Sequence, residues 1–170
     1  MTGSRRALIV LLVMITCVGC DQAAKTYATL ELANRPSIHV LGEVFRLQYT
    51  ENTGAMMGVG GDLPETARFW IFVVFAGCAL LTILAYTILG KNLCSIDILS
   101  FSLILGGGAG NLIDRLFKGG VVIDFMILTL GFVRTAIFNI ADIAVLSGLL
   151  LLGISNLSGF SKSRDSTIKS

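Results

Sequence analysis

The chain has 170 residues and a formal net charge of +2, and 54% of its residues are hydrophobic whereas only 14% are charged. Its mean hydropathy is +0.82. A soluble domain of this length has too small an interior to bury so much apolar surface, so the composition indicates a single-domain membrane protein. The small charge and the lack of a basic, aromatic-rich stripe argue against a nucleic-acid partner.

Four apolar segments are long enough to cross a bilayer, which requires about 20 helical residues. In chain order they are Ala7–Tyr27, Phe69–Leu89, Leu93–Leu116 and Ile137–Ile154. Lys and Arg residues precede the first segment, separate the second from the third and follow the fourth. Such residues mark the cytoplasmic side of a membrane. We therefore expect four transmembrane helices with both termini in the cytoplasm, and the loops Ala28–Arg68 and Phe117–Ala136 on the other side.

This arrangement predicts one transmembrane domain over residues 1–157. The residues that follow, 158–170, are rich in serine and lysine. Terminal segments of this composition are commonly disordered, so we expect a disordered cytoplasmic tail.

The beginning of the chain also has features of a lipoprotein signal peptide. Arg5 and Arg6 precede an apolar core, and small residues precede Cys20. However, Cys17 stands where a leucine-like residue is usual, and the core leads into Asp21 rather than into a flexible linker. We therefore expect this segment to be retained as the first membrane helix.

The two outer loops carry different patterns. Apolar and polar residues alternate over Phe45–Thr50, which predicts a strand, and Glu51–Gly54 is typical of a turn. A small sheet at the membrane surface is the expected result. Val121–Val133 is apolar but is shorter than a membrane span and is interrupted by Asp124. Its length favours a re-entrant or interfacial segment, with an extended segment packed against the helices as the alternative.

Ionisable side chains gather near the outer ends of the predicted helices, where their cost makes them candidates for a functional site. Asp21 and Lys25 are four residues apart with the acid first, which is the favourable order on a helix. The simplest interpretation is an ion pair at the helix end, with Lys25 snorkelling to the interface. The second cluster, Glu51 to Ala55, indicates only a turn when taken alone.

A third cluster ends the third predicted helix. Gly106–Gly110 suits the close approach of two membrane helices. Asn111 lies three residues before Asp114 and four before Arg115, so we expect the three side chains to share one face. Packing together with an ion pair at the helix end accounts well for the glycines and less well for Asn111.

The fourth cluster consists of Asp124, Asn139 and Asp142. Asn139 can cap the last helix, with Asp142 completing a capping box. Asp124 lies among apolar residues with no cation within three positions, so it requires a partner from elsewhere in the fold. Two neighbouring carboxyl groups share a proton, so that one is an acid while the other is a base that activates water. Asp124 and Asp142 are therefore the candidate catalytic pair.

Other chemistries have less support in the sequence. His39 is the only histidine and has no acidic partner nearby in sequence, so we expect it to be a surface loop residue. No glutamate-bearing zinc motif is present. The cysteines lie in or beside apolar runs without zinc-site or disulfide spacing: Cys17, Cys20, Cys78 and Cys94. We therefore expect neither a metal nor a cofactor.

Taken together, five motifs resemble those of the lipoprotein signal peptidase (signal peptidase II) family in order and spacing. They are Asp-Gln-x-x-Lys from residue 21, Glu-Asn-Thr-Gly-Ala from residue 51, Gly-Gly-x-x-Gly-Asn-Leu-Ile-Asp-Arg from residue 106, Val-Val-x-Asp-Phe from residue 121 and Phe-Asn-x-Ala-Asp from residue 138. Each motif is weak alone, but five in register over residues 21–142 are specific.

The resemblance implies an all-α membrane protein of four transmembrane helices, with a small periplasmic β-sheet, in the bacterial inner membrane. It implies an aspartic endopeptidase without metal, which removes the signal peptide from diacylglyceryl-modified prolipoproteins by cutting before the lipidated cysteine. Its partners would be these substrates and membrane lipids, and we expect a monomer. By motif, the catalytic aspartates are Asp124 and Asp142. The substrate-binding or supporting residues would be Asp21, Lys25, Asn52, Gly54, Asn111, Asp114, Arg115, Asn139 and Ala141.

Some positions depart from the family pattern. Thr135 and Ala136 replace an aromatic residue and a proline, and Ile143 replaces a common serine. They flank the motifs, so we expect them to affect substrate preference and rate rather than the chemistry. A membrane transporter with buried aspartates and an inactive relative are the alternatives. Clustering of the polar residues at one membrane face and the presence of both aspartates favour the peptidase.

Overall fold

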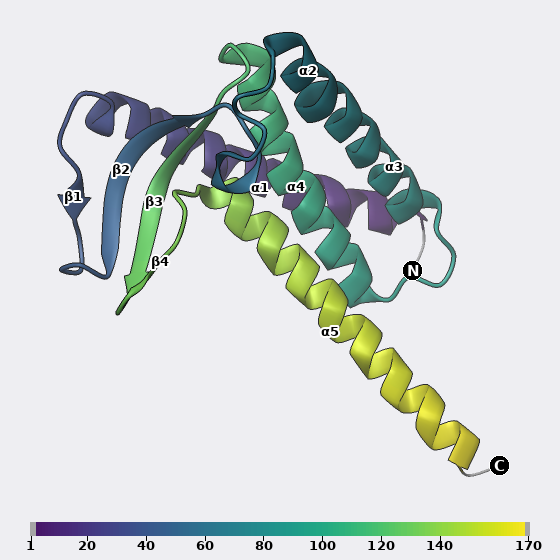
Figure 1. Ribbon diagram of the computed structural model, residues 1–170. Helices are drawn as coiled ribbons and strands as arrows, with labels where there is room; N and C mark the ends of the chain where they lie inside the picture. Colours follow the sequence, from purple (N-terminus) through teal and green to yellow (C-terminus); the bar gives the residue numbers. More distant parts are fainter. Residues whose placement is uncertain (1–2, 169–170) are drawn as a thin grey trace.

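In the computed structural model, which describes residues 3–168 and side chains as far as Leu157, four long helices dominate the fold (Figure 1). All four are long and apolar enough to cross a membrane. They are α1 (Gly3–Leu32), the continuous helix Glu65–Leu89, α4 (Ser95–Phe117) and the Ile140–Leu157 part of α5 (Ile140–Ile168). The prediction of a multi-pass membrane protein is confirmed. The tail expected at 158–170 stays a prediction, because its side chains lie outside those described.

The second of these helices is not uniform. It consists of α2 (Glu65–Phe69), a π-helical segment η2 (Trp70–Phe75) and α3 (Ala76–Leu89). Short π-helical segments within α-helices are frequent at functional sites, because they change the direction of the side chains that follow. Here the segment contains Phe72, which packs on an arginine of the candidate site described below.

A four-stranded antiparallel sheet lies beside one end of the helices (Figure 1). Its strands, in the order in which they pair, are β1 (Ile38–His39), β2 (Phe45–Asn52), β3 (Val122–Leu130) and β4 (Val133–Arg134). The long pair β2–β3 places Thr50 opposite Asp124 and Asn52 opposite Val122. A short 3-10 helix, η1 (Met56–Gly58), follows β2. The predicted fold class, helices with a small sheet, is confirmed.

Two local predictions need correction. The strand predicted at Phe45–Thr50 continues to Asn52, so Glu51 and Asn52 pair with β3 instead of forming a turn. Val121–Val133 is not re-entrant: most of it is strand β3, so the alternative of a packed, extended segment is correct. Its first four residues, Val122–Phe125, are all buried. A strand buried on both faces reads as a continuous apolar run, and this is why it resembled a membrane segment.

Glycines let α4 pack closely against the other helices. A Cβ atom on Gly106 would lie 2.6 Å from the Cβ of Cys17 in α1, and one on Gly107 would collide with the carbonyl oxygen of Ala141 in α5. Small residues are the usual means of close helix approach in lipid, where the hydrophobic effect does not drive helices together. The role predicted for the Gly106–Gly110 run is therefore confirmed, with α4 as the central helix.

The opposite end of the bundle is closed by Arg6. This buried side chain donates hydrogen bonds to the carbonyl oxygens of Thr87 and Ile88, both at 3.3 Å, and to that of Gly90. Basic side chains commonly satisfy the last carbonyl groups of a helix in this way. The bonds attach the beginning of α1 to the end of α3. The beginning of α1 and the connection between α3 and α4 lie at the end of the bundle away from the sheet (Figure 1).

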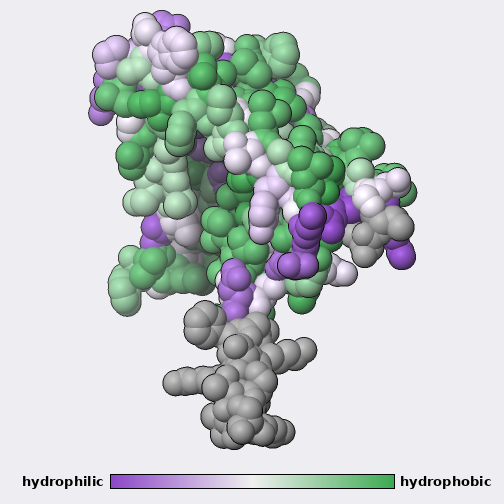
Figure 2. Space-filling model, turned by 90° about the vertical axis from the view of Figure 1, so that its right-hand side faces the viewer, coloured by the Kyte–Doolittle hydropathy of each residue, from purple (hydrophilic) through white to green (hydrophobic). Residues whose placement is uncertain are grey.

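The outer surface of the helices is apolar. Large hydrophobic side chains are exposed on all four long helices, among them Leu12, Phe75, Leu99 and Leu149. Figure 2 shows hydrophobic residues covering most of one face. A surface of this kind is matched to lipid acyl chains, in agreement with four membrane spans.

The close packing at Gly107 predicts that an alanine substitution there lowers stability far more than one at an unpacked glycine. We expect Gly107→Ala to destabilise the protein by about 1–3 kcal/mol, because the added methyl group overpacks the α4–α5 interface. Gly153→Ala is the matched control, since a Cβ atom there meets nothing within 4 Å. Thermal unfolding in detergent measures both. Equal effects of the two substitutions would contradict the packing described for α4.

Candidate active site

A buried lysine lies at the centre of the predicted polar residues. The Lys25 side chain is fully buried, and its ammonium group contacts three acceptors. They are Asp21 Oδ2 at 2.7 Å, Asp114 Oδ2 at 2.9 Å and Asn111 Oδ1 at 2.8 Å. An ammonium group has three donors, so each is used. The expectation that Lys25 snorkels to the interface is wrong, because its partners come from the neighbouring helix α4 as well as from α1.

The two buried aspartates attach other elements to this lysine. Asp21 Oδ1 accepts a hydrogen bond from the backbone N–H of Ala141 at 2.9 Å, which holds the first turn of α5. Asp114 Oδ2 accepts from the N–H of Ile123 in β3 at 3.2 Å, and its Oδ1 contacts Lys118 Nζ at 2.8 Å. The two buried anions, Asp21 and Asp114, are therefore balanced by the buried Lys25 and the partly exposed Lys118. They join α1, α4, α5 and β3 at one point, as buried ion pairs require.

The lysine also fixes the orientation of an amide. Because Lys25 can only donate, the atom of Asn111 that faces it must be Oδ1. The Nδ2 group of Asn111 is then directed at Asp142 Oδ1, to which it donates at 2.9 Å. The charged network and the candidate catalytic carboxyl group are thus connected by one side chain.

Asp142 lies in the first turn of α5 and forms a reciprocal cap with Asn139. The N–H of Asp142 donates to Asn139 Oδ1 at 3.0 Å, and the N–H of Asn139 donates to Asp142 Oδ2 at 3.1 Å. This is the capping box expected from the sequence. Since Asn139 Oδ1 accepts from the backbone, its Nδ2 group must point the other way. There it donates to Asp124 Oδ1 at 2.6 Å.

Asp124 lies on β3, and its side chain is 3% exposed. Its second oxygen, Oδ2, accepts from Asn52 Nδ2 at 3.0 Å across the β2–β3 pair. The pKa of Asp124 is raised to about 6, first by burial and also by the negative charge of Asp142, while the hydrogen bonds from Asn52 and Asn139 act in the opposite direction. The carboxyl group therefore changes protonation near neutral pH, as a general acid or base must.

The loop after β2 fixes Asn52. Asn52 Oδ1 accepts from the N–H of Gly54 at 2.9 Å, and its Nδ2 donates to the carbonyl oxygen of Ala55 at 3.1 Å as well as to Asp124. Gly54 is needed here because a Cβ atom would lie 2.5 Å from the carbonyl oxygens of Gly58 and Val59. The tight loop therefore holds the Nδ2 group of Asn52 in position to donate to Asp124.

Arg115 approaches the two carboxyl groups from α4. Its Nη2 donates to the carbonyl oxygen of Gly54 at 2.7 Å, and its guanidinium carbon lies 5.2 Å from the centre of the Phe72 ring. Its positive charge acts on both Asp124 and Asp142. The expectation that Asn111, Asp114 and Arg115 share one face is only partly correct. Asn111 and Asp114 share Lys25, whereas Arg115 turns to the loop after β2.

A cavity of about 420 Å³ opens onto Asp124. Its walls come from the end of β2, from Met57 and Gly58 in η1, and from Ala136 and Ile137 before α5. Ala136, one of the departures from the family pattern, therefore lines the approach to the candidate site together with Met57. Side chains in this position can influence which substrates reach Asp124.

All of the predicted site residues meet at this end of the bundle: Asp21, Lys25, Asn52, Gly54, Asn111, Asp114, Arg115, Asp124, Asn139, Ala141 and Asp142. Ala141 contributes its backbone N–H and close packing on Gly107. The sequence analysis missed three participants. Lys118 could have been found from its spacing of four from Asp114, and Gln22 lies inside a motif and donates to Asp114 Oδ1 at 2.9 Å. Nothing in the sequence around Phe72 indicates that it contacts the site.

His39 is part of β1, the edge strand, with β2 between it and β3. Its Nδ1 lies 3.3 Å from Glu43 Oε1, so the prediction that it has no acidic partner nearby in sequence is wrong. The partner was overlooked because it lies four residues away in a turn rather than on a helix. Within the described residues, no group of three or more His, Cys, Asp and Glu side chains converges as metal ligands would.

The central position of Lys25 predicts a large loss of stability upon its removal. We expect Lys25→Met to lower the free energy of unfolding by about 3–5 kcal/mol, because Asp21 and Asp114 would stay buried without their cation. Arg35→Met is the matched control. Its ion pair with Glu31 is exposed, with 62% and 41% of the two side chains accessible, and such pairs contribute about 1 kcal/mol or less. Unfolding in detergent distinguishes the two, and similar losses would contradict this account of the network.

Comparison with known proteins supports the family indicated by the motifs. The family model described as Signal peptidase (SPase) II matches residues 13–158. The lipoprotein signal peptidase of Pelodictyon phaeoclathratiforme is 37% identical over 151 residues, which cover 84% of this chain and 86% of the relative. That of Clostridioides difficile is 35% identical over 162 residues, covering 92% of this chain and 100% of the relative.

A solved structure described as a bacterial membrane enzyme superposes with a TM-score of 0.78 at 25% identity, covering 91% of this chain and 90% of the other. A second structure described in the same way gives a TM-score of 0.73, also at 25% identity. Sequence and fold thus agree over nearly the whole length, and the chain belongs to the signal peptidase II family of proteases.

Proposed function

We propose that this protein is an aspartic endopeptidase that removes the signal peptide from diacylglyceryl-modified prolipoproteins and cuts before the lipidated cysteine. The observation that carries the proposal is the pair Asp124 and Asp142, both bound by Asn139 beside a cavity. Asp124 has a pKa of about 6, raised by burial and by Asp142. Two neighbouring carboxyl groups that share a proton are the arrangement that allows one to act as acid and the other as base.

In the proposed reaction, Asp124 holds the shared proton and Asp142 is ionised. Asp142 takes a proton from a water molecule, whose oxygen attacks the carbonyl carbon of the scissile amide, while Asp124 gives its proton to the carbonyl oxygen. The proton on Asp142 then passes to the amide nitrogen, and the C–N bond breaks. The products are a signal peptide with a new carboxyl group and a lipoprotein whose cysteine has a free α-amine, and Asp124 recovers its proton as the carbonyl group re-forms.

The neighbouring side chains suit an extended substrate backbone. Arg115 carries a guanidinium group held between Gly54 and Phe72, and Asn52 presents an amide at the cavity wall. Both are directed by contacts that do not involve the substrate, so little ordering is needed when it binds. We assign substrate positioning to Arg115 and Asn52, and support of the carboxyl groups to the remaining polar residues of the motifs.

The location of the site fits a substrate anchored in lipid. A diacylglyceryl cysteine keeps the scissile bond close to the membrane surface. Strand β3 and the beginning of α5, which carry Asp124 and Asp142, lie where the helices meet the sheet (Figure 1). The basic residues Arg6 and Lys91 belong to the opposite end, which supports a cytoplasmic location for that end. We infer a monomer in the bacterial inner membrane with cytoplasmic termini and the site near the periplasmic face. Buried polar groups gathered at one end favour this function over transport.

Both aspartates are predicted to be essential. We expect Asp124→Asn and Asp142→Asn each to lower the cleavage rate of a diacylglyceryl-modified prolipoprotein by at least about 100-fold, because each removes the acid or the base. Asp62→Asn, an exposed aspartate, is the matched control. A gel-shift assay with purified protein in detergent measures cleavage, with a chelator present throughout. Undiminished cleavage by either variant, or loss of wild-type cleavage with chelator, would refute the proposal.

The raised pKa of Asp124 predicts a pH dependence. If Asp124 donates a proton, kcat/KM falls as pH rises through about 6, since kcat/KM follows ionisation of the free enzyme. The hydrogen bond from Asn52 lowers the pKa of Asp124, so Asn52→Ala raises it. We therefore expect the alkaline limb of the profile to move to higher pH in Asn52→Ala. A limb that stays in place or moves to lower pH would contradict the role assigned to Asp124.

A further inference from the structure

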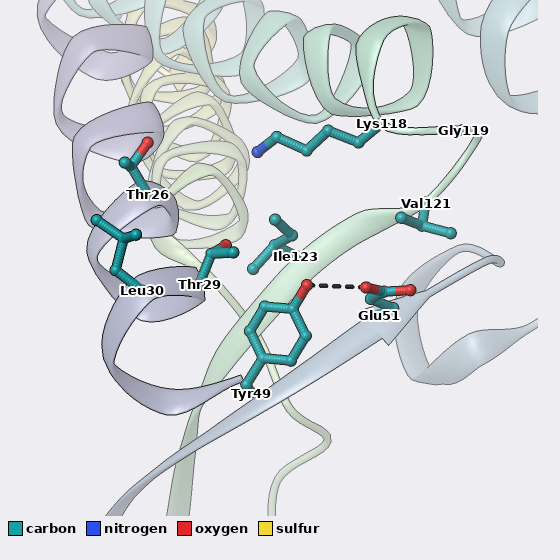
Figure 3. A pocket seen from close by; sticks show the side chains of 9 residues that line it. All are labelled: Thr26, Thr29, Leu30, Tyr49, Glu51, Lys118, Gly119, Val121 and Ile123. Carbon is teal, nitrogen blue, oxygen red and sulfur yellow. Dashed lines mark hydrogen bonds between the residues drawn. The ribbon is translucent and has the colours of Figure 1, made fainter. Parts of the chain in front are cut away.

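A second cavity lies on the other side of the β2–β3 pair. Its volume is about 570 Å³, and it is walled by the end of α1, by β2 and by the turn between α4 and β3 (Figure 3). Because side chains alternate along a strand, Tyr49 projects to the face opposite Thr50 and Asn52. Thr50 and Asn52 line the cavity at Asp124 and Tyr49 lines the second one, while Glu51 reaches both cavities. The two cavities therefore lie on opposite faces of the β2–β3 pair and meet at Glu51.

One side of this cavity presents oxygen atoms that can only accept. The hydroxyl groups of Thr26 and Thr29 donate to backbone carbonyl oxygens of α1 at 2.7 and 2.8 Å, and that of Tyr49 donates to Glu51 Oε1 at 2.9 Å. Burial, together with Glu51, raises the pKa of Tyr49, so the phenol stays protonated. Thr29 also hydrogen-bonds to Tyr49, and the remaining lone pairs of these hydroxyl groups, with the carboxylate of Glu51, are left for a ligand that donates hydrogen bonds.

The other side carries a cation. Lys118 extends into the cavity from the turn after α4, across from the Tyr49–Glu51 pair (Figure 3). Among the described residues its ammonium group has one recorded acceptor, Asp114 Oδ1 at 2.8 Å, and 30% of the side chain is exposed. Two of its three donors are therefore left for an anion. Gly119 and Gly120 have φ values of +66° and +84°, which side chains rarely adopt, so the turn that presents Lys118 depends on them.

The remaining walls are apolar and adjoin the end of the spanning helix α1. Leu30, Val121 and Ile123 complete the lining, and Leu30 is 73% exposed at the outer end of the spanning helix α1. A ligand that contains an anionic group, a cationic group and acyl chains would complement the cationic, the hydrogen-bond-accepting and the apolar walls. A membrane phospholipid has this composition.

We propose that this cavity binds the headgroup of a phospholipid that carries a primary ammonium, with its phosphate at Lys118 and its ammonium among Glu51, Tyr49 and the two threonines. A primary ammonium has three N–H donors for these acceptors, whereas a quaternary ammonium has none. The proposal goes beyond the peptidase function, because the cavity lies on the opposite face of β2 and β3 from Asp124.

The test compares two lipids with identical acyl chains, phosphatidylethanolamine and phosphatidylcholine, on the full chain purified in detergent. Native mass spectrometry gives an apparent Kd for each. We expect the wild type to prefer phosphatidylethanolamine by about tenfold, the effect of one charge-assisted hydrogen bond. Glu51→Gln should lose this preference, and Tyr49→Phe should reduce it. Lys118→Gln should weaken the binding of both lipids to the same extent. Glu43→Gln, which removes the same charge from an 85% exposed side chain, should keep the preference.

Equal binding of the two lipids by the wild type, or an unchanged preference in Glu51→Gln, would overturn the ammonium site. Water-soluble glycerophosphoethanolamine is the last probe. If it binds as tightly as the lipid, the occupant is not a membrane lipid and the proposal fails. Tyr49→Phe keeps the test decisive if Glu51→Gln does not fold. Binding is measured without cleavage, so failure here leaves the proposed peptidase function untouched, and the reverse is also true.

Discussion

The structure depends on one buried charge, the ammonium group of Lys25, with its three acceptors on Asp21, Asn111 and Asp114. A cation removed from water is stable only when every donor is used, so the three acceptors must stay in place. Asp21 and Asp114 in turn hold the first turn of α5 and the beginning of β3, which are the elements that carry Asp142 and Asp124. The buried contacts of Lys25, which hold the helices together, therefore also position the carboxyl groups of Asp124 and Asp142.

The direction of the hydrogen bonds extends this constraint to the two candidate catalytic carboxyl groups. A lysine that only donates orients Asn111, and Asn111 then donates to Asp142. Backbone N–H groups orient Asn52 and Asn139 in the same way, and both amides then donate to Asp124. Each carboxyl group thus accepts from fixed donors, yet burial and mutual repulsion keep the pKa of Asp124 near 6. Such preorganisation is what proton transfer at neutral pH requires.

Much of the fold and of the candidate site could be predicted from the sequence, because polar residues in membrane segments are rare and costly and therefore stand out. Apolar runs gave the four spans, and the cost of charge in membranes singled out Asp21, Lys25 and Asp124. The conformation of Val121–Val133 could not be predicted, since a strand buried on both faces has the same apolar pattern as a membrane segment. The burial of Lys25 was also missed, because local sequence shows its partner on α1 but not those on α4. Phe72 and the second cavity depend on tertiary contacts alone.

The most direct test is a crystal structure of the Asp142→Asn protein with an uncleaved diacylglyceryl-modified prolipoprotein. The account predicts the scissile carbonyl oxygen within hydrogen-bond distance of Asp124 and the scissile bond beside the amide at position 142. It also predicts that Arg115 and Asn52 contact the substrate backbone. A scissile bond placed away from both side chains, or Asp124 turned away from Asn52 and Asn139, would contradict the assignment of this pair as the catalytic centre.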